Sequence, residues 1–139
     1  MANSDSTPSR YLDLLFFTGL ALLLCHELDA VAQSEWRLLP YLSTLPDGEA
    51  YTLFVLLHIP LFALLLWWAG SLSAKVRKRT QLTIDAFMVF HAGLHFALRH
   101  QADYTFHSTL SEMCIFGAGA VGLLHAVLRI RQASIQVDR

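Results

Sequence analysis

Long apolar runs alternate with short polar segments along this chain, and the runs are long enough to cross a membrane. Four runs stand out, at about residues 11–33, 49–71, 81–98 and 108–130. A bilayer core of roughly 30 Å requires about 20 mostly apolar residues per helical span. Because lipid offers the backbone no hydrogen-bonding partners, each run is expected to be a helix. The pattern predicts an all-α fold: an integral membrane four-helix bundle that forms one domain over residues 1–139.

The composition agrees with this pattern. Of the 139 residues, 55% are hydrophobic and 15% are charged, which is apolar for a protein of this size. The first run is interrupted by Asp13 and is followed by no small-x-small cleavage site, so we expect a retained span and not a signal peptide. A formal net charge of −1 gives no indication of a nucleic-acid partner. The expected surroundings are the lipid bilayer, and the sequence is compatible with a homo-oligomer.

The distribution of basic residues predicts the orientation. Eight of the ten Lys and Arg residues fall on one side of the predicted topology, namely Arg10, Lys75, Arg77, Lys78, Arg79, Arg129, Arg131 and Arg139. By the positive-inside rule that side is cytoplasmic. We therefore expect both termini in the cytoplasm, in a protein of the bacterial inner (plasma) membrane.

Titratable side chains interrupt the apolar runs at a similar depth. The stretch ALLLCHELDAVAQSEW, residues 21–36, introduces His26, Glu27 and Asp29 into the first span. At about 1.5 Å per residue, groups from the other three runs fall in the same outer half of the bundle. They are His58, His91, His95 and Glu112. A carboxylate at membrane depth is costly unless it is paired or metal-bound, so these side chains are expected to face inward.

The spacing of these residues indicates a metal site. His91 and His95 are four apart and His26 and Asp29 three apart, so each pair projects from one helix face. We predict that a transition metal is bound by a set drawn from His26, Asp29, His58, His91 and His95. Mixed imidazole and carboxylate ligands suit zinc or iron, and the two cysteines of the chain are too few for an iron–sulfur cluster.

Such a site allows catalysis. Zinc held by three protein ligands with an open position activates water, and Glu27 or Glu112 is then the candidate general base. A lipid or a small apolar molecule entering from the outer leaflet is the expected substrate.

Other interpretations stay open at this point. The polar layer is equally expected in a non-catalytic accessory protein or a proton-coupled carrier, where it only fastens helices. A single b-type haem held by His26 with His95, or by His58 with His91, is a further alternative. Glu35 can reach the layer from the first long loop, although an interfacial glutamate is ordinarily solvated.

Two features outside this layer complete the prediction. Asp85 and His125 lie at a similar depth nearer the inner face, and their pairing would fasten the third run to the fourth or open a proton path. His100 and His107 lie in the connection before the fourth run and are expected to be ordinary loop residues.

The motif HELDA, residues 26–30, resembles the HXXEE-motif type of small four-span bacterial membrane proteins. In that type a His precedes two acidic residues inside the first span. His26 and Asp29 match the His and the first acidic position, whereas Ala30 stands in the place of the second acid. The resemblance implies a four-span membrane protein with a polar layer, and no particular reaction.

Overall fold

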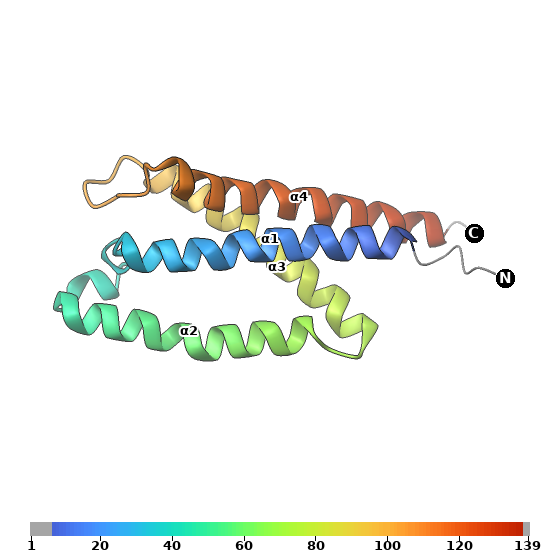
Figure 1. Ribbon diagram of the computed structural model, residues 1–139, viewed down its shortest axis with the longest axis horizontal. Coiled ribbons are helices and arrows are strands. Elements are labelled where there is room, and N and C mark those ends of the chain that lie inside the picture. Colours follow the sequence, from blue (N-terminus) through green and yellow to red (C-terminus); the bar gives the residue numbers. More distant parts are fainter. Residues whose placement is uncertain (1–6, 138–139) are drawn as a thin grey trace.

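The computed structural model describes residues 7–137, which fold into four long α-helices and two short 3-10 helices (Figure 1). In chain order they are α1 (Thr7–Ala32), η2 (Glu35–Arg37), η3 (Leu42–Thr44), α2 (Asp47–Ala69), α3 (Ala74–Leu98) and α4 (Thr109–Val137). The predicted all-α class with four helices is therefore confirmed.

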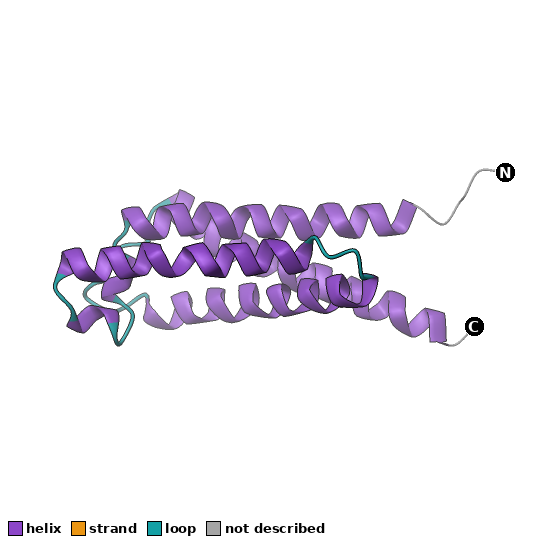
Figure 2. Cartoon of the chain, turned by 90° about the horizontal axis from the view of Figure 1, so that it is seen from below, coloured by secondary structure: helices purple, strands orange, loops and turns teal. Residues whose placement is uncertain are grey.

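The helices run back and forth along one long axis. α1, α2 and α4 run nearly parallel, and α3 crosses obliquely from α2 to α4 (Figure 1). The connections α1–α2 and α3–α4 lie at one end, and the short α2–α3 connection lies at the other (Figure 2). α1, α3 and α4 form the packed core, whereas α2 lies on its flank against α3, η2 and η3.

Three of the four helices are long and apolar enough to cross a membrane. These segments are Arg10–Ala32 in α1, Asp47–Ala69 in α2 and Thr109–Ile135 in α4. They leave many large apolar side chains uncovered, most of all on α2, where Ala50, Phe54 and Ala69 alone are buried. Lipid is the medium in which such a surface is stable. The three helices thus indicate an integral membrane protein.

α3 differs from the predicted third span. It begins at Ala74 and not near residue 81, because the Ser73 hydroxyl accepts a hydrogen bond from the Val76 amide and caps the helix. The basic residues Lys75, Arg77, Lys78 and Arg79 consequently occupy its first turns and not a loop. Since these charges, Asp85 and two histidines make α3 less apolar than the others, its crossing of the membrane stays a prediction.

Close backbone approach joins α3 to α4. A Cβ at Gly119 would lie 2.7 Å from the Cβ of Ala92, and one at Gly122 would lie 3.3 Å from the Asp85 carbonyl oxygen. Larger residues at these positions would push the helices apart. This packing fixes α3, and the histidines that it carries, against the centre of the bundle.

Candidate metal centre

The loop after α1 turns back over the end of the bundle. Ser34 adopts the left-handed conformation, with φ of 60°, and the 3-10 helix η2 follows at once. This turn buries Glu35 and Trp36. A loop glutamate is thereby placed among the helices and not in solvent.

Glu35 meets three histidines from two helices. One ligand atom from each of His26, Glu35, His91 and His95 lies within 4.8 Å of the others. The His26 and His91 Nε2 atoms are 2.8 Å apart, and the Glu35 carboxylate oxygens lie 3.5 Å from His26 Nε2 and 3.6 Å from His95 Nε2. Ligand atoms around a tetrahedral zinc ion with bonds of 2.0–2.1 Å lie about 3.3 Å apart. The observed spacings bracket that value.

Aromatic side chains enclose these four residues, which we call the histidine–glutamate cluster. The ring centroid of Phe106 lies 5.5 Å from that of His26 and 4.8 Å from that of His95. Phe87 stacks on His91 with centroids 5.3 Å apart. His26 and His95 are fully or almost fully buried, with 0% and 2% of their surface exposed. A low-dielectric shell of this kind strengthens binding of a cation by the carboxylate.

Hydrogen bonding at the cluster favours metal ligation. The Tyr104 hydroxyl lies 3.3 Å from His95 Nδ1, which leaves Nε2 directed at Glu35. The Nε2 atoms of His26 and His91 face each other, so at most one of them can donate in that contact. Among the described residues, Glu35 Oε2 is buried without a hydrogen-bonding partner, whereas His26 faces the cluster through Nε2. A cation between Glu35 and the facing Nε2 atoms would use lone pairs that the protein leaves unpaired.

The charge of Glu35 is set by its neighbours. Burial by itself raises the pKa of the Glu35 carboxyl, but the imidazoles of His26 and His95 lower it further than burial raises it, to about 2. Burial raises the pKa of Tyr104. At neutral pH the cluster therefore holds an ionised carboxylate, and Tyr104 keeps its hydroxyl proton.

Glu27 and His58 form a separate pair beside the cluster. His58 Nε2 lies 2.9 Å from Glu27 Oε2, and His58 Nδ1 lies 2.6 Å from the Phe54 carbonyl oxygen. A carbonyl only accepts, so Nδ1 carries the proton in that contact. The contact with Glu27 then requires a second proton, which the carboxyl and the imidazole share.

The predicted site residues divide into two groups. Of the five predicted ligands, the structure brings His26, His91 and His95 together, whereas His58 pairs with Glu27, and Asp29 accepts a 3.3 Å hydrogen bond from Gln33. The carboxylate in the cluster is Glu35, which the sequence analysis named only as a loop residue within reach of the polar layer. The apolar Trp36 beside it was the available signal of a buried loop.

The second predicted base lies elsewhere. Glu112 is exposed in a surface pocket of about 270 Å³ that also contains Arg99, His100 and His107. His100 and His107 are themselves exposed, as expected of loop residues.

Asp85 and His125 make the predicted pair. The His125 Nδ1 and Asp85 Oδ2 atoms are 2.6 Å apart, and both side chains are fully buried. A neighbouring network links Arg129 to the Asp13 carboxylate at 3.3 Å and to the side-chain carbonyl of Gln81 at 2.9 Å. These contacts fasten α1, α3 and α4 to one another.

The chain belongs to DUF6713, a family of unknown function, whose model matches residues 12–132. The matched range contains all four residues of the histidine–glutamate cluster. Comparison with curated proteins and with solved structures gave no significant match. The family is thus shown, whereas the resemblance of HELDA to the HXXEE-motif type stays a prediction.

Proposed function

We propose that this DUF6713 protein is an integral membrane protein that binds one divalent transition-metal ion through the histidine–glutamate cluster. The convergence of four ligand atoms from α1, η2 and α3 within 4.8 Å supports this proposal above all. Three neutral imidazoles and one carboxylate also balance half of the charge of a divalent cation, which lowers the cost of holding the ion away from water.

Zinc is the ion that we expect first. Imidazole nitrogen and carboxylate oxygen are ordinary zinc ligands, and a four-coordinate tetrahedral site matches the number of groups present. Iron(II) shares this preference and is the main competitor. A b-type haem held by His26 with His95 is disfavoured, because two imidazoles on opposite faces of a porphyrin cannot approach as closely as these two rings do. A haem held by His58 with His91 is disfavoured because His58 Nε2 pairs with Glu27.

The proposed topology has four spans with both termini in the cytoplasm. The basic first turns of α3 and the α4 residues Arg129 and Arg131 lie toward the same end of the bundle as the beginning of α1 (Figure 1). The positive-inside rule assigns that end to the cytoplasm. Arg139, which contributed to the sequence prediction, lies outside the described residues. With this orientation the cluster occupies the half of the bundle near the outer leaflet.

Catalysis by the metal site is a second candidate, favoured by the position of Glu27. This residue follows the cluster residue His26 in the chain, shares a proton with His58 and lines an apolar groove. A zinc ion held by only three of the four cluster residues would keep one position open, and it would there supply Lewis-acid activation of water or of a carbonyl group. With the shared proton held by His58, the Glu27 carboxylate would accept the proton of the attacking water in a hydrolysis of a lipid or a small apolar substrate. The surface position of Glu112 gives no such support.

Metal analysis of the purified protein tests the main proposal. The full-length chain in detergent is compared with a His91→Ala, His95→Ala double variant and with a His100→Ala, His107→Ala double variant as the matched control. We expect near-stoichiometric metal in the wild type and in the control, and its loss from the cluster variant. A wild-type protein without metal after reconstitution with zinc or iron(II), or a cluster variant that retains it, would contradict the proposal. A visible spectrum of the same samples separates haem from a bare ion.

A further inference from the structure

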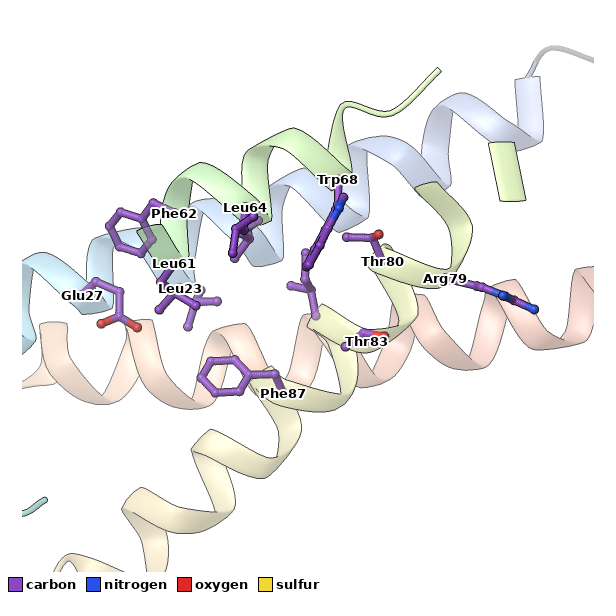
Figure 3. A pocket seen from close by; sticks show the side chains of 12 residues that line it. Leu23, Glu27, Leu61, Phe62, Leu64, Trp68, Arg79, Thr80, Thr83 and Phe87 are labelled. Atoms are coloured by element: carbon purple, nitrogen blue, oxygen red, sulfur yellow. The ribbon is translucent and has the colours of Figure 1, made fainter. Parts of the chain in front are cut away.

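An apolar groove runs between α2 and α3, with α1 as its floor (Figure 3). Its volume is about 440 Å³. Leu61, Phe62 and Leu65 form the α2 wall, Ile84 and Phe87 form much of the α3 wall, and Leu23 lies between them. The groove exists because α2 lies on the flank of the bundle and makes few contacts with the core.

The two ends of the groove differ in chemistry. Arg79 marks one end, where Thr80 and Thr83 also line the groove and the guanidinium points outward, and Glu27 marks the other end (Figure 3). Within residues 7–137 no carboxylate lies at ion-pair distance from Arg79, whereas Glu27 is neutralised by its contact with His58. The groove is therefore a hydrocarbon-like channel with an unpaired positive charge at one end.

The length of the groove suits part of a lipid acyl chain. From Thr80 to Phe87 it follows α3 for about 10 Å, since each helical residue rises about 1.5 Å. Leu64 and Trp68, which line it, are also exposed on the outside of α2. Hydrocarbon chains of the bilayer thus have direct access from the side.

We propose that this groove binds one acyl chain of an anionic phospholipid, whose phosphate pairs with Arg79. The apolar walls match the chain, and the unpaired guanidinium matches the phosphate, for which arginine is well suited geometrically. A peptide is a poor occupant, because few groups in the groove would pair with its backbone N–H and C=O groups. Lipid binding at this groove does not require a metal ion in the histidine–glutamate cluster.

The test measures lipid that stays with the full-length protein after extraction from vesicles. The vesicles contain equal amounts of phosphatidylglycerol and phosphatidylcholine with identical chains, and retained lipid is quantified by mass spectrometry. Arg79→Gln removes the charge at the groove end, and Thr83→Trp fills the groove from an exposed position on α3. Lys78→Gln is the matched control, since it removes one charge from the neighbouring residue, which does not line the groove.

We expect the wild type to retain phosphatidylglycerol in preference to phosphatidylcholine. Arg79→Gln should lower the retained phosphatidylglycerol about fivefold, and Lys78→Gln less than about twofold. Thr83→Trp should lower retention of both lipids. Equal losses in the Arg79 and Lys78 variants would overturn the assignment, because they would indicate general attraction to an anionic surface.

A second experiment distinguishes a phospholipid from a free fatty acid as the source of the bound acyl chain. Palmitate added at the concentration of phosphatidylglycerol should not displace the phospholipid, and displacement would overturn the phospholipid assignment in favour of a free fatty acid. Metal content at saturating metal, measured on the same samples, should be unchanged in all three variants. Failure of lipid binding is thereby separated from failure of the metal proposal.

Discussion

Two buried groups of imidazoles and carboxylates lie in neighbouring layers of the bundle. Asp85 and His91, one from each group, are about 9 Å apart along α3. The Asp85–His125 group has one carboxylate for one imidazole, and its atoms meet at 2.6 Å. The histidine–glutamate cluster has one carboxylate for three imidazoles, and Glu35 stays at 3.5–3.6 Å from two of them.

The different ratio of carboxylates to imidazoles explains why the two groups make different hydrogen-bonding contacts. A single Asp–His pair completes its central hydrogen bond without help and can serve as a fastening between α3 and α4, although Asp85 Oδ1 and His125 Nε2 have no partner among the described residues. Three imidazoles around one carboxylate leave lone pairs facing each other, as the two Nε2 atoms of His26 and His91 do. Two groups of the same chemical type therefore suit different tasks, one structural and one ligand-binding.

Lowering the pH should have the largest effect, because it should weaken metal binding at the cluster and leave the Asp85–His125 contact intact. Metal binding requires unprotonated imidazoles, so lowering the pH from 7 to 5 should reduce metal affinity by at least about tenfold for each ligand imidazole that becomes protonated. Glu35, with its pKa lowered to about 2, stays ionised throughout this range and does not contribute to the loss. The Asp85–His125 contact tolerates a protonated imidazole. Metal titrations at several pH values, with far-UV circular dichroism as the control for folding, test this; metal affinity independent of pH would contradict it.

Removing Asp85 should have the largest effect on stability. Asp85→Ala leaves His125 buried without its partner, which should cost about 3–5 kcal/mol of unfolding free energy. The Asp85→Leu, His125→Leu double variant should recover most of that loss, because no unpaired polar group is left. Denaturation in detergent micelles measures both, and metal content should stay near that of the wild type. A double variant no more stable than Asp85→Ala would argue against a simple fastening.

Removing the charge of Glu35 should lower the affinity for metal and not the stability of the fold. Glu35→Gln keeps the shape of the side chain, and we expect metal affinity to fall at least about 100-fold. Glu49→Gln, on the exposed first turn of α2, is the control for a general change in charge. Calorimetric titration with zinc measures both variants; equal affinities would remove Glu35 from the ligand set.

The smallest expected effect belongs to Tyr104. Tyr104→Phe removes the hydroxyl group that contacts His95 Nδ1 and should lower metal affinity about tenfold. Because the ring is retained, unfolding free energy without metal should change little. An unchanged affinity would show that His95 is oriented by packing alone.

The regular geometry of the α-helix explains which parts of the site could be predicted from the sequence. His26, His91 and His95 lie on regular helices, where residue spacing sets both the face and the depth of a side chain. Glu35 lies after a left-handed Ser34, and no periodicity in the sequence reports that turn. His58 and Asp29 were predicted at the same depth as the cluster, but the rotation of each helix about its own axis directs them to other partners. The start of α3 was missed because its basic turns are polar yet helical, held by a cap at Ser73.

The position of Glu35 on η2 links the histidine–glutamate cluster to α2, which forms one wall of the groove. The next residue, Trp36, donates a 3.0 Å hydrogen bond to Asp47, the first residue of α2, and Arg37 pairs with the same carboxylate. An ion held by Glu35 would therefore restrain α2, which is one wall of the proposed lipid groove. If both proposed sites bind, their affinities are reciprocal: a lipid that favours the metal-bound position of α2 would raise metal affinity by the same factor by which the metal raises lipid affinity. The short loop would then couple the lipid composition of the membrane to the loading of the ion.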